Sequence, residues 1–216
     1  MRRAGMRESS STDGKQLYDR CKRIGDAVLS ALLLVFLSPV MALIALAILL
    51  DDPSASPIFA QTRVGLNGRL FTLYKFRTMH PGADAQKEDL MKRNEMQGPV
   101  FKMKDDPRVT RLGKFLRRSC ADELPQLVNV LMGDMSLVGP RPGLPEEVAG
   151  YDCHALQRLQ ILPGITCLWQ SRPDRYSLTF GEWVELDLRY IRERDFLLDC
   201  RILLETLGTV VEMNGI

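Results

Sequence analysis

The sequence predicts an α+β protein that is mostly helical: a membrane-associated domain with an N-terminal re-entrant helix-break-helix and a small β-hairpin. Three observations predict this fold class. An uncharged apolar run covers residues 27–50, an Asn-Gly pair separates two runs of β-forming residues, and helical periodicity dominates the C-terminal part. The 216 residues are 45% hydrophobic and 26% charged, a composition typical of globular proteins.

Composition also excludes several classes of protein. The 29 Lys and Arg residues nearly balance the 27 Asp and Glu residues, and the net charge of +2 argues against a nucleic acid partner. The five cysteines include no C-x-x-C pair, which argues against a disulfide framework or a zinc site and favours a reducing, cytosol-facing environment. Only two histidines are present, too few for a three-histidine metal site.

The apolar run predicts a membrane segment. We expect residues 1–20 to form a mobile basic tail and residues 21–52 to form a membrane helix. Residues 27–50 would give about 36 Å of helix, enough to cross a hydrocarbon core of about 30 Å. The run is long for a signal-peptide core and no small-residue cleavage site follows it, so the segment should persist in the mature protein.

Pro39 determines the shape of this segment. It lacks an N–H and lies near the centre of the run, so the helix must kink there, and Ser38 can hydrogen-bond the freed backbone. Each arm is about 16 Å long, close to half a bilayer. A wedge that enters and leaves one face and a kinked spanning helix both fit these residues. Hydropathy alone favours the span, and the basic flank places the N-terminus in the cytoplasm.

The remaining elements follow from periodicity and turn residues. Asn67-Gly68 predicts a hairpin between strands at Ile58–Val64 and Leu70–Phe76. Residues 109–118 predict a basic amphipathic helix suited to anionic head groups. The other elements are expected, in chain order, as a short exposed helix at 83–96, a helix from Ser119 or Asp122 to about Met132 that stops at Gly133, a rigid loop around Pro140, Pro142 and Pro145, a short helix at 151–160, a turn and strand within 162–170, and one or two long helices over 180–211.

Asp122 and Glu123 are adjacent acids at a predicted helix start. Acids in this position are usually capping groups. A catalytic role is favoured over capping by the many cations in segments stiffened by proline or glycine, because arginine can bind phosphate oxygens with two parallel hydrogen bonds. These cations are Arg63, Lys75, Arg77, Arg108, Arg117, Arg118 and Arg141. An acid pair among them suggests a phosphoryl-transfer site with a divalent metal; the sequence contains neither a P-loop nor a Rossmann fingerprint.

Five segments carry more specific motifs. They are KFRTM (75–79), DDPRVTRLGKFLRR (105–118), DELPQLVNVLMGDMSLVGPRP (122–142), LPGITCLWQ (162–170) and DLRYIRERDFLLDCRILLETL (187–207). Together they closely resemble the bacterial sugar transferase family, the monotopic phosphoglycosyl transferases, over residues 20–211. The resemblance implies a small, stand-alone form, with a re-entrant helix broken at Ser38-Pro39 and a catalytic domain over 53–216 that forms one functional unit with the membrane helix.

The resemblance implies transfer of a sugar phosphate from a UDP-sugar to polyprenol (undecaprenyl) phosphate, with release of UMP. This step would initiate exopolysaccharide, O-antigen or glycoconjugate synthesis. The implied mechanism is ping-pong: Asp122 is the nucleophile that forms a covalent phosphosugar-aspartate, and Glu123 together with Asp122 holds Mg²⁺. Arg141 would contact the nucleotide or the phosphates. The further substrate-binding candidates are Lys75, Arg77, Arg117, Arg118 and Asp187.

Two positions depart from the family pattern. Arg189 stands where the first tyrosine of a D-L-Y-Y-like stretch is expected, and Cys167 stands where many members have glycine. Cys167 could narrow a nearby pocket or have no consequence.

The resemblance also implies a location. UDP-sugars are cytoplasmic, so the wedge is favoured over the span, and the protein would be monotopic in the bacterial inner membrane with its catalytic domain on the cytoplasmic face. The expected partners are the donor, the lipid acceptor and inner-membrane lipid, without nucleic acid; an oligomer is possible. Two alternatives stay open: a membrane-anchored scaffold of polysaccharide assembly, whose acids are only caps, and a metal-dependent UDP-sugar hydrolase, in which Asp122 activates water. The transferred sugar is left open.

Overall fold

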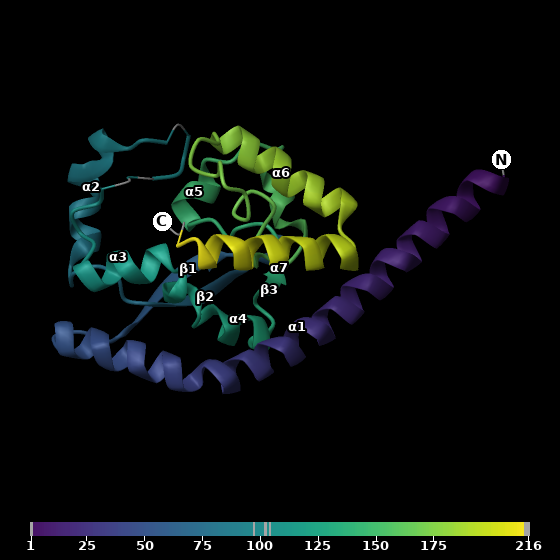
Figure 1. Cartoon of the computed structure of the whole chain (residues 1–216). Coiled ribbons are helices and arrows are strands. Elements are labelled where there is room, and N and C mark those ends of the chain that lie inside the picture. Colours follow the sequence, from purple (N-terminus) through teal and green to yellow (C-terminus); the bar gives the residue numbers. More distant parts are fainter. Residues whose placement is uncertain (1, 97, 102, 104, 214–216) are drawn as a thin grey trace.

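The structure, a computed structural model, describes residues 2–96, 98–101, 103 and 105–213. It confirms a mostly helical α+β fold, in which two small sheets lie among helices (Figure 1). The α-helices and strands, in chain order, are α1 (Arg2–Asp51), β1 (Ile58–Val64), β2 (Leu70–Phe76), α2 (Lys87–Leu90), α3 (Arg111–Arg118), α4 (Gln126–Met132), β3 (Ser136–Val138), α5 (Pro145–Ala149), β4 (Gly164–Thr166), α6 (Phe180–Glu193) and α7 (Phe196–Val211).

Helix α1 is continuous through Pro39, so the predicted interruption between two separate helices is wrong. The helix bends instead, and its N-terminal and C-terminal parts run in different directions (Figure 1). Pro39 removes one backbone donor, which would have paired with the carbonyl of Val35. The Ser38 hydroxyl donates to that carbonyl at 2.8 Å, as expected from the Ser-Pro pair, and so the helix continues.

The first part of α1 also differs from the prediction. Residues 2–20 were expected to be a tail, but they belong to the helix, and Lys15, Tyr18 and Asp19 contact the C-terminal helices. These partners lie more than 170 residues away along the chain, so no local pattern indicates them. By length and composition, α1 from Gly14 to Asp51 could cross a membrane.

The hairpin is confirmed, with both strands at their predicted bounds. Strands β1 and β2 pair antiparallel from Ile58 opposite Phe76 to Val64 opposite Leu70. Asn67 and Gly68 both have positive φ, at 53° and 80°, which Asn and Gly tolerate best. The second sheet is a short parallel pair, with Ser136 opposite Gly164 and Val138 opposite Thr166.

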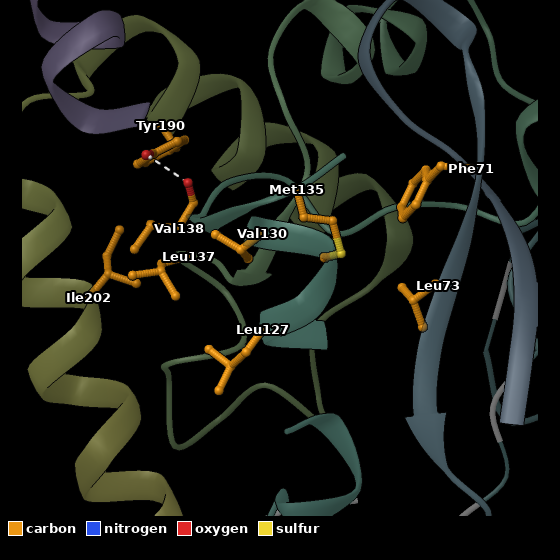
Figure 2. Close-up of a cluster of buried hydrophobic side chains, with 9 residues drawn as sticks. All are labelled: Phe71, Leu73, Leu127, Val130, Met135, Leu137, Val138, Tyr190 and Ile202. Carbon is orange, nitrogen blue, oxygen red and sulfur yellow. Dashed lines mark hydrogen bonds between the residues drawn. The ribbon is translucent and has the colours of Figure 1, made fainter. Parts of the chain in front are cut away.

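The main core lies between β2, α4, β3, α6 and α7 (Figure 2). Its buried members are Phe71, Leu73, Leu127, Val130, Met135, Leu137, Val138, Tyr190 and Ile202. Leu33, Leu34 and Leu37 of α1 pack against this core. A second apolar cluster joins the C-terminal part of α1 to the hairpin and to α3 through Ile48, Phe76 and Leu116. The domain therefore rests on both parts of the bent helix.

Several predicted helices are shorter than expected. Within 83–96, a 3₁₀ turn, the four-residue α2 and a second 3₁₀ turn end at Arg93. Residues 155–160 form a 3₁₀ helix. The helix expected from residue 119 or 122 begins only at Gln126, because Cys120 adopts a left-handed φ of 54° and residues 121–123 form a separate 3₁₀ turn. Its stop at Gly133, with φ of 95°, is confirmed.

Candidate active site

The acid pair lies in the 3₁₀ turn Ala121–Glu123, between α3 and α4. The neighbouring Ala121 and Leu124 pack into the apolar cluster beneath, which includes residues of the C-terminal part of α1. Asp122 is buried, with 7% of its surface exposed, and no side-chain capping bond is made at the start of either this turn or α4. The capping interpretation therefore has no geometric support.

Asp122 and Glu123 line a cavity of about 580 Å³, a volume usual for a small-molecule site. Four cations predicted from the sequence to bind substrate also line it: Lys75, Arg77, Arg117 and Arg141. These residues come from the hairpin, from α3 and from the loop after β3. The fold thus brings together side chains that are spread over more than 60 positions of the chain.

Glu123 is the centre of the charged contacts in this cavity. Its Oε1 lies 2.6 Å from Lys75 Nζ and 3.7 Å from Arg141 Nη1. Burial would raise the pKa of Glu123, but the charges of Lys75 and Arg141 and the hydrogen bond from Lys75 outweigh it and hold the pKa well below its usual range. Glu123 is therefore an anion at neutral pH.

Asp122 has the opposite electrostatic environment. Burial raises its pKa from 3.8 to about 6; Lys75 opposes this, the negative charge of Glu123 adds to it, and Arg117 and Arg141 oppose it. Asp122 is thus ionised at pH 7.5 but held in a poorly solvated site. Among the residues that the structure describes, none forms an ion pair with Asp122. A desolvated carboxylate of this kind is suited to act as a nucleophile or a base.

Arg117 is directed into the site by close packing of α3. Its Nε donates to Thr78 Oγ1 at 3.0 Å. The helix can approach this segment because Gly113 has no side chain: a Cβ there would lie 2.0 Å from the carbonyl oxygen of Thr78. Burial lowers the pKa of Arg117. The guanidinium nevertheless stays charged, since arginine titrates far above neutral pH.

The loop that carries Arg141 is held on two sides. Arg63 of β1 donates to the carbonyl of Pro142 at 3.0 Å and to Gln61 Oε1 at 2.7 Å. On the other side, Arg158 donates to the carbonyl of Arg141 at 3.2 Å. Arg63 was predicted only as one of many cations, and no sequence pattern indicated a role for Arg158. Both are positioning residues for Arg141.

Arg158 is in turn held by a buried acid, Asp187. Arg158 Nε and Nη2 lie 2.8 and 2.7 Å from Asp187 Oδ2, and Arg158 Nη1 donates to the Tyr151 hydroxyl at 2.9 Å. Asp187 has no exposed surface. A sequence signal for this pair did exist: Asp187 falls on the same face of α6 as the buried Trp183, Val184 and Leu188, and a charge on a buried face needs a partner.

Three of the predicted substrate contacts differ in their placement from Lys75, Arg117 and Arg141. Asp187 lies behind Arg158 and does not line the cavity. Arg118 is exposed on α3 and does not line it either. Arg77 does border the cavity, but its guanidinium is engaged by Asp52 at the end of α1, through the backbone carbonyl and the carboxylate. Local spacing does not reveal that Arg77 and Asp52 meet.

Two stacked tryptophans form an apolar part of the cavity wall that the sequence did not predict. The rings of Trp169 and Trp183 are 4.0 Å apart and nearly parallel, with an interplanar angle of 5°. Cys167 is buried beside them, and its Sγ donates to Gln170 Oε1 at 3.2 Å. The thiol itself does not line the cavity. The other departure, Arg189, is exposed and pairs with Glu193 at 2.8 Å, as expected for a solvated helix surface.

The acids present can contribute to a magnesium site but cannot complete one. No group of three or more His, Cys, Asp or Glu suited to a metal occurs within the residues that the structure describes. Mg²⁺ in phosphoryl-transfer sites is commonly bound by one or two carboxylates together with substrate phosphates and water. Asp122 and Glu123 fit that arrangement, with substrate supplying further oxygens. The donor set fits an ion shared with a phosphorylated ligand.

Comparison with known proteins places these residues in context. The family model of the bacterial sugar transferases matches residues 17–213. The chain is 48% identical over 158 residues to galactosyl transferase CpsE of Streptococcus agalactiae, 36% identical over 198 residues to exopolysaccharide production protein ExoY of Sinorhizobium fredii, and 36% identical over 198 residues to undecaprenyl-phosphate galactose phosphotransferase of Salmonella typhimurium. These matches cover 73%, 90% and 90% of this chain, and 35%, 87% and 41% of the three relatives.

Proposed function

Because the chain belongs to the bacterial sugar transferase family, we propose that it transfers a sugar phosphate from a UDP-sugar to polyprenol phosphate and releases UMP. Two relatives named for phosphotransfer to undecaprenyl phosphate, one for galactose and one for glucose, support this reaction class. The chain spans 41% and 35% of the length of these two relatives.

One observation carries the proposal: a buried carboxylate, Asp122, lines a cavity in which Lys75, Arg117 and Arg141 provide positive charge. A nucleotide sugar carries its negative charge on a diphosphate. Cations that neutralise this charge allow an anionic carboxylate to approach phosphorus. A scaffold protein would gain nothing from this arrangement, because burying the Asp122 carboxylate costs stability.

The reaction divides into two displacements. An oxygen of Asp122 attacks the β-phosphorus of the donor, the bond from that phosphorus to the bridging oxygen breaks, and UMP leaves with the electron pair. A phosphate oxygen of the polyprenol phosphate then attacks the same phosphorus, which frees the Asp122 carboxylate and gives a polyprenyl diphosphate sugar. Lys75, Arg117 and Arg141 are placed to bind the phosphate oxygens throughout. A magnesium ion bound by Asp122 and Glu123 would supply additional charge neutralisation.

The contacts of α1 support a wedge over a spanning helix. Near its start, Tyr18 and Lys22 contact Asp199 of the globular domain, and at its end Asp52 contacts Arg77 of the same domain. If α1 crossed the bilayer, these two ends would lie about 30 Å apart on opposite sides, and one polar domain could not contact both. We therefore place the domain and both helix ends on one face, which the use of a UDP-sugar would make the cytoplasmic face of the inner membrane.

The proposal is tested by incubating the purified full chain with a panel of UDP-sugars, with and without undecaprenyl phosphate. We expect UMP release and a lipid-linked sugar phosphate with one or a few donors, and a sugar-phosphate adduct on the protein when the acceptor is omitted. Continuous UMP release together with free sugar phosphate in the absence of lipid would indicate the hydrolase. No UMP release with any donor would support the scaffold.

We expect the low-pH side of the pH–rate profile of the donor reaction, its acid limb, to follow the ionisation of Asp122. Its pKa of about 6 predicts that kcat/KM for the donor falls as the pH drops through about 6, because the protonated acid cannot attack. Lys75 is the charge that lowers this pKa most. Lys75→Met should therefore move the limb to higher pH by about one unit, in addition to lowering the rate. The exposed Lys114→Met is the matched control and should leave the limb in place; a limb that moves to lower pH in Lys75→Met would contradict this assignment.

A further inference from the structure

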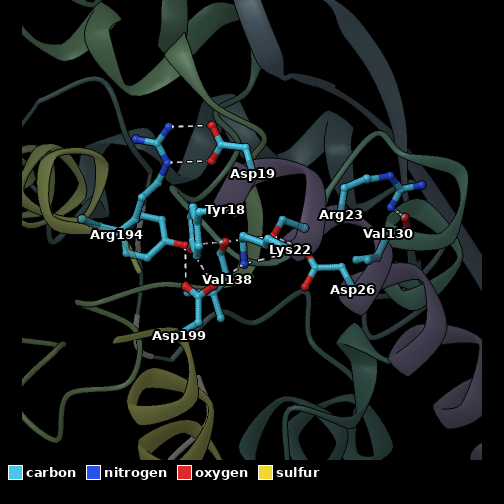
Figure 3. A network of polar contacts seen from close by, with 11 residues as sticks. Tyr18, Asp19, Lys22, Arg23, Asp26, Val130, Val138, Arg194 and Asp199 are labelled. Carbon is cyan, nitrogen blue, oxygen red and sulfur yellow. Dashed lines mark hydrogen bonds and ion pairs between the residues drawn. The ribbon is translucent and has the colours of Figure 1, made fainter. Parts of the chain in front are cut away.

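A polar network outside the active site joins the first part of α1 to the globular domain (Figure 3). Its centre is Asp199 of α7, with only 6% of its surface exposed. Asp199 Oδ2 accepts hydrogen bonds from Tyr18 at 2.7 Å and Lys22 at 2.8 Å, and Oδ1 accepts one from Tyr190 at 2.6 Å. One carboxylate thus connects α1, α6 and α7. None of the proposed chemistry uses it.

A second contact lies one turn further along the same face of α1. Asp26 Oδ2 accepts a hydrogen bond from Ser136 at 2.6 Å and lies 3.7 Å from Lys22 Nζ. The Ser136 and Tyr190 hydroxyls also lie 2.9 and 3.1 Å from the carbonyl of Val138, at the end of β3. Figure 2 shows the Tyr190 contact from the side of the core. The network therefore ends at the strand that leads into the loop of Arg141.

The contact face of α1 changes character along the helix. Tyr18, Lys22 and Asp26 provide polar contacts, whereas beyond them the contacts to the domain are apolar, through residues such as Leu34, Ile44 and Ile48. Apolar packing inside a bilayer is weakly directional and competes with lipid tails of equal polarity. Charge-assisted hydrogen bonds are short and directional. The polar face is therefore the part of α1 that can set its angle to the domain.

The other end of the membrane segment has a second polar contact, between Arg77 and Asp52. The apolar segment lies between the two contacts, and the turn with Asp122 rests on its C-terminal part through Ala121 and Leu124. Because the bent helix fixes how the domain sits on the bilayer, its angle determines the depth of Asp122 relative to lipid phosphates. A soluble donor reaches the cavity at any such angle, but a lipid-anchored acceptor does not.

We propose that Asp199 is a positioning residue for the acceptor step: through Tyr18 and Lys22 it sets the membrane helix so that a bilayer-embedded polyprenol phosphate reaches Asp122. This role rests on the proposed function. It predicts that variants of this network slow the acceptor step but not the donor step, because the donor step does not depend on the bilayer.

The test uses three variants of the full-length chain. Tyr18→Phe removes one hydrogen bond to Asp199, and Lys22→Met removes the contacts of Lys22 with both Asp199 and Asp26, while Asp199 keeps its other partners in each. The third variant is Asp199→Asn. The first measurement is the burst of UMP and of protein labelling with UDP-sugar alone. The second is kcat/KM for long-chain undecaprenyl phosphate in liposomes, and the third uses a short-chain polyprenol phosphate in detergent. We expect the burst with UDP-sugar alone to stay within about twofold of that of the unsubstituted chain. The kcat/KM for undecaprenyl phosphate in liposomes should fall about tenfold, and the kcat/KM for the short-chain acceptor in detergent should equal that of the unsubstituted chain.

The matched control is Arg201→Gln, which removes an exposed ion pair with Glu205 within α7, the helix that carries Asp199, and should change none of the three measurements. Equal losses in donor labelling and lipid transfer in Lys22→Met and Tyr18→Phe would overturn the positioning role and leave a general stabilising network. Unchanged transfer in liposomes would overturn it as well. Absence of donor labelling in the unsubstituted chain would instead refute the proposed function.

Discussion

Asp122→Asn is expected to abolish sugar-phosphate transfer, with a loss of at least about 10³-fold in kcat. The amide cannot form the bond to phosphorus, so both the UMP burst without acceptor and the protein adduct should disappear. The measurement is UMP release, with mass spectrometry of the peptide that contains position 122. Asp134→Asn, an acid-to-amide change on the far side of α4, is the matched control and should retain activity. An adduct that persists in Asp122→Asn would contradict the assignment of the nucleophile.

This loss should occur without loss of stability. The pKa of Asp122 is raised in the folded protein from 3.8 to about 6, so the folded state holds the proton more tightly than the unfolded state. The contribution of Asp122 to the free energy of unfolding therefore decreases as the pH rises from about 4 to about 6 and stays lower above that range. Asn carries no charge. The Tm of Asp122→Asn should consequently equal or exceed that of the unsubstituted chain at pH 7.5, and the difference should shrink at pH 4.

Features with a local cause were predictable from the sequence. The hairpin depends on Asn67 and Gly68, which adopt positive φ within the turn itself, and Ser38 compensates for Pro39 one residue away. Asp122 and Glu123 were predictable as a candidate site because they are adjacent in the sequence and many cations lie in the neighbouring segments. Their actual backbone was not predictable: Cys120 adopts a left-handed conformation without being glycine, so the expected single helix is divided into a 3₁₀ turn and α4.

Features that depend on distant pairing were missed for a physical reason. Tyr18 and Asp199 are 181 positions apart, and the pairing of Arg77 with Asp52 and of Arg158 with Asp187 arises only from packing of whole elements. A charged residue carries the same local signal whether it faces a substrate or a buried partner. That is why Arg77 and Asp187 were assigned to substrate, although one holds the end of α1 and the other holds Arg158.

The Arg158–Asp187 pair allows this distinction to be measured. Asp187 has no exposed surface, and burial raises its pKa although Arg158 opposes the rise. Asp187→Leu would leave the Arg158 guanidinium buried without its counter-ion, and we expect the free energy of unfolding to fall by about 3–5 kcal/mol. The comparison is Asp174→Asn, which breaks a pair of similar length with Arg172 that is about half exposed; its expected cost is below about 1 kcal/mol. Denaturant unfolding of both variants provides the measurement.

The double variant Asp187→Leu/Arg158→Met separates the stabilising role of the pair from its positioning role. Replacing a buried ion pair by apolar side chains of similar size is often neutral, so most of the lost stability should return. Activity should not return with it, because the carbonyl of Arg141 and the hydroxyl of Tyr151 would still lack the donor that Arg158 provides. Since Arg141 borders the donor cavity, KM for the UDP-sugar should rise about tenfold or more while the fold is intact. If stability and activity return together, Arg158 supports only the fold. If stability returns without activity, the role of Arg158 is to hold Arg141 opposite Glu123.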